Sequence, residues 1–134
     1  MIDHHAALIY TMVLVSASDA DMTDAELSTI SETVRYLPVF RDFDTGQLTR
    51  IAADCTQLLS QSDGLDTALE EIKEALPKKL RETAYAVACD VAAADGEASQ
   101  EELRVLEMMR HRLNIDRLIA AGIERGARAR FQTL

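Results

Sequence analysis

The chain repeats itself once at a spacing of 76 residues, and this repeat limits the folds open to it. Each copy consists of an apolar helical segment, a short acidic turn and an amphipathic helical segment. Six pairs of identical residues fall on one another: Val15 and Val91, Ala17 and Ala93, Asp19 and Asp95, Glu26 and Glu102, Leu27 and Leu103, Leu37 and Leu113. We therefore expect two similar units, packed about a pseudo-two-fold axis that could bring the two acidic turns together.

Apolar residues recur at three- and four-residue steps along nearly the whole chain, which is typical of helices. The pattern predicts an all-α fold of about seven helices. We expect a single domain over residues 1–134, with repeat 1 at about 2–37, connecting helices at 44–76, and repeat 2 at about 77–113. A C-terminal helix and tail would occupy 116–134, with the helix fraying after Gly126. Pro77 suits the first residue of a helix.

The two helices that open the repeats are apolar almost all round, which predicts central, buried positions for both. The helix after the first acidic turn is amphipathic, and its pattern predicts burial of Leu27, Ile30, Val34 and Leu37. Aromatic residues make up only 4% of the chain, so the core must be aliphatic.

Part of each acidic turn has a local structural explanation. Thr23 with Glu26, and Ser99 with Glu102, have the spacing of a capping box, in which the hydroxyl and the carboxylate each accept a backbone N–H at a helix start. Gly96 suits a helix C-terminus that requires a positive φ, whereas the first turn has Ala20 at this position.

Helix capping leaves other acids of the turns unexplained. Asp19 and Asp95 close helices, where a carboxylate faces the negative end of the helix dipole, and a further acid follows two residues later. Hard cations need several oxygen ligands, so a divalent cation of the Ca²⁺ or Mg²⁺ class is one hypothesis, and pure capping is the other. The candidate metal ligands are Asp19, Asp21, Glu26, Asp95, Glu97 and Glu102. An EF-hand is excluded because the sixth and twelfth loop positions do not fit.

The net charge of −9 disfavours nucleic acid and anionic membrane surfaces as partners. The apolar stretch from Ala6 to Ala17 is too short to span a bilayer, so direct membrane insertion is not expected. Cations or basic faces of partner proteins are the natural counterparts. The C-terminal end is an exception, because Arg117, Arg125, Arg128 and Arg130 gather there. An ordinary bias of cations toward the end of a helix explains this arrangement.

The sequence of the second turn, Ala92 to Glu102, follows the pattern A-x-A-D-G-x-x-[ST]-x-x-E at the end of an alanine-rich helix. This pattern resembles the TerB family, and the first copy, Ala17 to Glu26, follows it more loosely. The resemblance implies a cytoplasmic, all-helical domain linked to tellurite resistance and stress responses, acting with partner proteins that are possibly membrane-associated. It also implies that the six acids are metal ligands.

Other candidate residues give no catalytic centre. Cys55 and Cys89 lie in apolar helical surroundings, so buried, reduced thiols are expected and a thiol-based tellurite reductase is the least favoured function. Asp90 lies in an apolar helix. It is either an outward-facing or hydrogen-bonded acid, or else an inner ligand or an acid with a raised pKa. No nucleophile–base set or phosphate loop is present, so we expect a non-enzymatic binding module.

Overall fold

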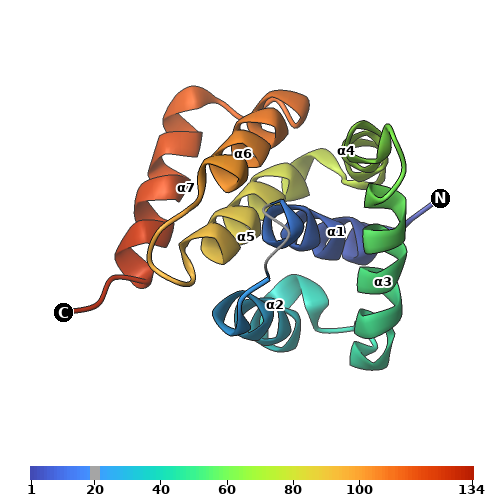
Figure 1. Cartoon of the computed structure of the whole chain (residues 1–134), viewed down its shortest axis with the longest axis horizontal. Helices are drawn as coiled ribbons and strands as arrows, with labels where there is room; N and C mark the ends of the chain where they lie inside the picture. Colours follow the sequence, from blue (N-terminus) through green and yellow to red (C-terminus); the bar gives the residue numbers. More distant parts are fainter. Residues whose placement is uncertain (19–21) are drawn as a thin grey trace.

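The computed structural model describes residues 1–18 and 22–134, and this part of the chain contains helices and turns but no strand. The predicted all-α fold is confirmed, with seven α-helices in the described residues (Figure 1). They are α1 (His4–Ala17), α2 (Asp24–Tyr36), α3 (Leu48–Leu59), α4 (Gly64–Ala75), α5 (Arg81–Ala93), α6 (Gln100–Arg112) and α7 (Arg117–Arg130). Short 3₁₀ turns cover Pro38–Phe40, Thr45–Gln47 and Lys78–Leu80. None of these helices has the length and apolar character needed to cross a bilayer.

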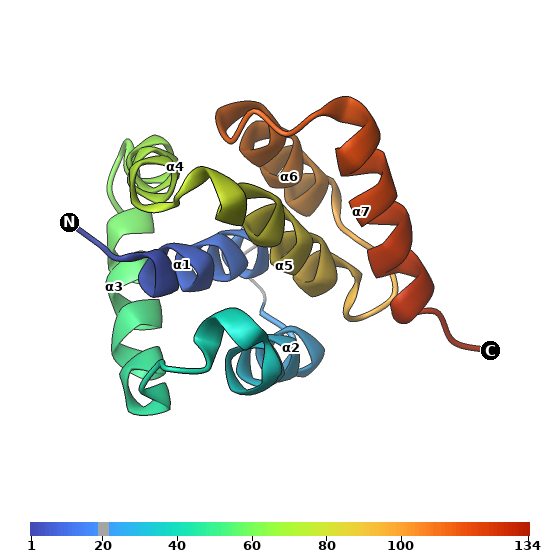
Figure 2. The ribbon, with the colours of Figure 1, turned by 180° about the vertical axis from the view of Figure 1, so that it is seen from behind.

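Helices α1 and α5 form the centre of the molecule (Figures 1 and 2). Residues 5–16 of α1 are all buried, because this helix is surrounded by α3, α4, α5 and α6. The alanines of α5 allow close approach to α1 on one side and to α7 on the other. The two central positions predicted from the apolar pattern are therefore confirmed.

The internal repeat includes one more helix than the sequence indicated. Helix α3 packs on α1 as α7 packs on α5, so each unit has three helices, and α4 lies between the units along the chain. The central helix of each unit also packs against the second helix of the other unit, because α1 contacts α6 and α5 contacts α2. Each central helix therefore supports the amphipathic helix of the other unit.

Two predicted helix boundaries are wrong. Pro77 precedes the 3₁₀ turn Lys78–Leu80, and α5 begins only at Arg81. Helix α7 does not fray after Gly126 but continues to Arg130. Its last turn is held because Ala127 is buried and the Arg130 guanidinium pairs with the Asp90 carboxylate on α5. Asp90 is thus the hydrogen-bonded acid of the two alternatives, not an inner ligand.

The predicted burial of Leu27 is also wrong, because 48% of this residue is exposed. Its repeat partner Leu103 is 49% exposed. In both helices the preceding glutamate, Glu26 or Glu102, is buried instead. The capping box turns that glutamate toward the body of the protein, and the next residue, about 100° further round the helix, therefore faces outward. Ile30 and Val34 are buried as predicted, and Leu37 is half-buried.

The start of α4 depends on a glycine. A Cβ placed on Gly64 would lie 2.1 Å from the backbone oxygen of Leu58, whereas a Cβ on Gly122, within α7, would meet nothing within 4 Å. We expect Gly64→Ala to lower the free energy of unfolding by about 2 kcal/mol or more, because backbone must shift. Gly122→Ala should raise it by about 0.5–1 kcal/mol through helix propensity. Urea denaturation followed by circular dichroism measures both, and equal effects of the two substitutions would contradict the close packing at Gly64.

Candidate functional site

Both predicted capping boxes are present. The Thr23 hydroxyl accepts the Glu26 N–H at 3.1 Å, and Glu26 Oε1 accepts the Thr23 N–H at 2.9 Å. Ser99 and Glu102 repeat this geometry, with distances of 3.1 Å and 2.8 Å. Glu26 and Glu102 are only 1% and 2% exposed. One carboxylate oxygen of each is therefore committed to a helix start, which reduces what either residue can offer a metal ion.

The second acidic turn presents its other two acids to solvent. Asp95 and Glu97 are exposed, and neither forms an ion pair with a described residue. Gly96 separates them with φ of +97°, the left-handed conformation that the sequence predicted there. The equivalent acids of the first turn, Asp19 and Asp21, lie outside the described residues.

The ends of the two turns approach each other through the exchanged packing of the units. Ala17 and Ser18, at the end of α1, line one pocket of about 300 Å³ together with Glu101 and Arg104 of α6. The first acidic turn therefore starts, at the end of α1, beside α6, which is the helix that follows the second turn. Within residues 1–18 and 22–134, however, no three His, Cys, Asp or Glu side chains are placed to hold a metal ion together.

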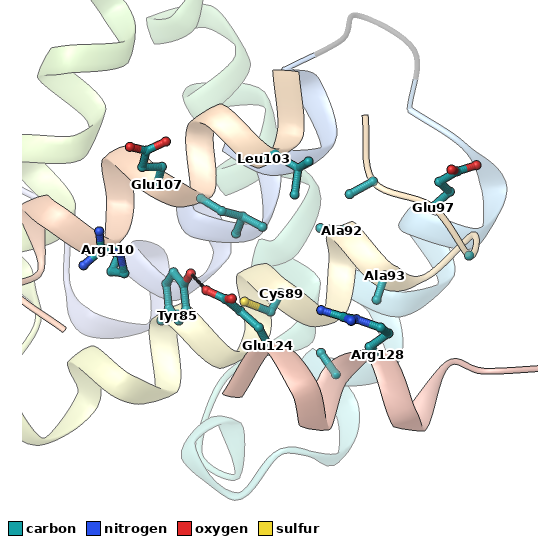
Figure 3. A pocket seen from close by; sticks show the side chains of 14 residues that line it. Tyr85, Cys89, Ala92, Ala93, Glu97, Leu103, Glu107, Arg110, Glu124 and Arg128 are labelled. Atoms are coloured by element: carbon teal, nitrogen blue, oxygen red, sulfur yellow. Dashed lines mark hydrogen bonds between the residues drawn. The ribbon is translucent and has the colours of Figure 1, made fainter. Parts of the chain in front are cut away.

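A larger pocket, of about 480 Å³, lies next to the second turn (Figure 3). We call it the α5–α7 groove, because it lies over α5 between α6 and α7. Most of its lining is apolar, from Ala92, Ala93, Ala98, Leu103, Leu106 and Ala127. A pocket of this size and character is typical of ligand-binding sites.

Polar groups lie at defined places around the α5–α7 groove. The Tyr85 hydroxyl donates a hydrogen bond to the Glu124 carboxylate, which ties α5 to α7 (Figure 3). Burial, followed by this hydrogen bond, raises the pKa of Tyr85 above its usual value, so the phenol stays protonated. Glu97 from the turn and Glu107 from α6 are exposed at the edge, and Arg128 projects from α7.

Comparison with known protein families identifies the chain. It matches the family described as tellurite resistance protein TerB over residues 5–122. The chain belongs to the TerB family. No curated protein and no solved structure matches it significantly. The matched range includes all of α2 to α6, both capping boxes, and the greater part of the α5–α7 groove.

The TerB family is associated with tellurite resistance, so the reactivity of the two cysteines bears on the function of this TerB chain. Both are free and buried. Burial raises the pKa of Cys55 to about 12 and that of Cys89 to about 12, with nearby Glu71 and Glu124 respectively adding to the increase. Because the thiolate is the reactive form, both thiols are nearly inert at neutral pH. This result disfavours the thiol-based reductase.

Sequence reasoning named some residues of the α5–α7 groove, such as Cys89, Gly96 and Glu97, but assigned them other roles and did not predict the groove in this TerB chain. Leu103 was matched only as a repeat position, and Glu124 and Arg128 lie on a helix whose packing partner was unknown. One signal was available: a glutamate at the third position of a capping box is followed by a residue that faces away from it. Applied to Glu102, that rule predicts an exposed Leu103.

The thiol pKa values predict slow chemical labelling. At pH 8 a pKa of about 12 leaves roughly one thiol in ten thousand ionised. Native protein should therefore react with Ellman's reagent far more slowly than denatured protein, and Cys55→Ser and Cys89→Ser variants should each show one slow thiol. Fast release of thionitrobenzoate from the native chain would show that at least one thiol is accessible as thiolate.

Proposed function

We propose that this TerB-family chain is a non-enzymatic protein-interaction module, and that its docking site is the α5–α7 groove. The observation that carries the proposal is an open, largely apolar hollow at the family motif, with a half-exposed leucine on its wall. Large apolar side chains that remain exposed beside a concave apolar surface are typical of protein-binding sites.

The partner we propose is a basic amphipathic helix of another protein. An apolar side chain of that helix would enter the hollow beside Leu103 and Ala93, as in other helix-in-groove complexes. Its Lys or Arg residues would face Glu97 and Glu107, which are exposed at the edge and free of ion pairs with described residues.

The repeat supplies a matched control for a test of this site. Leu103 and Leu27 occupy equivalent positions and have nearly equal exposure, but only Leu103 lines the groove. We expect Leu103→Asp to weaken binding of a partner by about tenfold or more, because it places a charge in an apolar contact. Leu27→Asp should leave the affinity unchanged. Both variants remain folded, since neither side chain is part of the core.

The measurement has two stages. Proteins captured from a lysate by the wild-type chain are identified, and the affinity of one purified partner is then measured for the two variants by calorimetry, with and without chelator. In a host that depends on this chain for tellurite resistance, Leu103→Asp should also reduce survival on tellurite. If Leu27→Asp and Leu103→Asp reduce the affinity for the partner equally, or if neither reduces it, the groove is not the docking site.

A second candidate function is a cation-responsive module, and one specific observation favours it. Asp95 and Glu97 are exposed without ion-pair partners, and the end of α1, from which the first turn departs, lies beside α6. A divalent cation of the Ca²⁺ or Mg²⁺ class would then link Asp95 and Glu97 to Asp19 and Asp21. Glu26 and Glu102 would contribute only the oxygen not used for capping.

Calorimetric titration with Ca²⁺, Mg²⁺, Mn²⁺ and Zn²⁺ tests this second candidate. If it is correct, one ion binds more tightly than about 1 mM, and Asp19→Asn with Asp95→Asn weakens it by about tenfold or more. Asp24→Asn with Glu101→Gln is the control, because it removes two exposed acids from the starts of α2 and α6, the helices that follow the two acidic turns. Equal effects of the two double variants would indicate general electrostatic attraction and not a site.

The remaining parts of the proposal concern context. We propose that the chain acts in the cytoplasm, because two free cysteines are usual in reducing compartments. Nucleic acid is disfavoured as a partner by the charge of −9. A membrane-associated partner protein fits this proposal, because the docking helix needs only to be basic and amphipathic.

A further inference from the structure

We propose that copies of this chain associate head to tail, with the outer face of α7 on one copy docking against an aspartate-lined hollow at the opposite end of the next copy. Both surfaces lie outside the acidic turns, and neither the hollow nor Arg117 and Arg125, which carry the basic face, belongs to the α5–α7 groove, so this association is independent of the proposed function.

The outer face of α7 is basic although the chain is acidic. Residues 117–134 have a net charge of +3, which leaves −12 on residues 1–116 from the total of −9. The one acid of α7, Glu124, is turned inward to Tyr85, and Arg130 is bound to Asp90. Arg117 and Arg125 are exposed and form no ion pair with any described residue.

The same face also carries an exposed apolar side chain. Leu118 is 82% exposed, in the first turn of α7. Ala121 and Gly122 lie one turn further along and are exposed too, so another backbone can approach closely there. A face with unpaired arginines around exposed apolar surface fits an acidic protein surface, because arginine is suited to pairing with carboxylates at interfaces.

The chain itself has an acidic surface of this kind. A hollow of about 440 Å³ lies at the N-terminal end of α1, beside the start of α3, and we call it the N-terminal hollow. Four aspartates line it: Asp3, Asp42, Asp44 and Asp54. The basic groups of its lining residues are Arg50, which is paired with Asp54 at 3.4 Å, His5 and the amino group of Met1.

The N-terminal hollow can take a guanidinium in two ways. Its carboxylates have spare acceptor capacity, since Asp42 contacts the His5 ring at 3.5 Å and Asp44 accepts the Gly46 N–H, and each carboxylate has further lone pairs. The rings of Phe43 and Tyr10 also line the hollow, and an arginine stacks on aromatic faces. The Phe43 ring is fixed by contact with His5 and Phe40.

The two surfaces lie at opposite ends of the longest axis of the molecule (Figures 1 and 2). Helix α7 forms one end, and the N-terminus with α3 forms the other. One copy therefore cannot pair its own basic face with its own hollow. Pairing between copies is heterologous, and it leaves a free basic face and a free hollow at the ends of each assembly.

The overall charge of −9 on each copy opposes association, but at an ionic strength of about 0.1 M charges separated by more than roughly 10 Å are largely screened. Contacts at the interface then dominate. Since exposed ion pairs are individually weak, we expect association at high micromolar concentration that is lost at high salt.

Charge-swapped variants of the full chain provide the test. One variant, Arg117→Glu with Arg125→Glu, lacks the basic face. The other, Asp42→Lys with Asp54→Lys, lacks the acidic hollow. In sedimentation velocity up to about 1 mM protein, the wild-type chain should form dimers and larger species, and each variant alone should remain a monomer. An equimolar mixture should associate again, because the intact basic face of one variant fits the intact hollow of the other and the swapped charges on the remaining two surfaces are also complementary.

Arg35→Glu with Arg104→Glu is the control, since these exposed arginines on α2 and α6 lie outside both surfaces and the charge change is the same as for the α7 variant. It should associate like the wild-type chain. A wild-type chain that stays monomeric at about 1 mM, or a mixture that forms no dimer, overturns the proposal. So does binding to phosphatidylglycerol vesicles through Arg117 and Arg125 without self-association, because α7 would then be a lipid-binding face.

Discussion

The packing of α1 against α5 is the contact on which the rest of the structure depends. Each of these helices is apolar on nearly all sides, so each must be surrounded, and burying one leucine-sized side chain contributes about 1.5–3 kcal/mol. Four of the other helices pack on α1 and three on α5, with α2 and α6 in contact with both. Because each unit leaves its central helix incompletely covered, the two units complete one another's cover.

The sequence predicted the architecture because the signals for it are local and repeated. Periodic apolar residues, two capping boxes and a glycine with positive φ all appear in the structure where their spacing placed them. The errors arise where a tertiary contact overrides a local pattern. Helix α7 continues past Gly126 because Arg130 pairs with Asp90, a contact 40 residues apart that no local pattern indicates.

The candidate site was less predictable for a related physical reason. A carboxylate at a helix start has the same sequence pattern whether it serves the cap or a ligand, and only its geometry distinguishes the two roles. For Glu26 and Glu102 one oxygen of each serves the cap, while Asp95 and Glu97 remain free of such a role. The α5–α7 groove could not be inferred because its walls come from α6 and α7, and the distance between these two helices depends on the side chains of α5.

The two units differ at two positions of their central helices that affect how α7 is held. At the position of Leu14, which is buried, the second unit has Asp90, which holds the end of α7. At the position of Ile9 it has Tyr85, whose hydroxyl binds Glu124 on the same helix. Neither polar contact is needed to pack the central helix at these positions, because the first unit has apolar residues there. Both fix α7 relative to α5, and a groove wall must be fixed if it is to recognise a partner without a large entropic cost of ordering. The polar substitutions in the second unit therefore make that unit the better candidate for the binding site of this TerB domain.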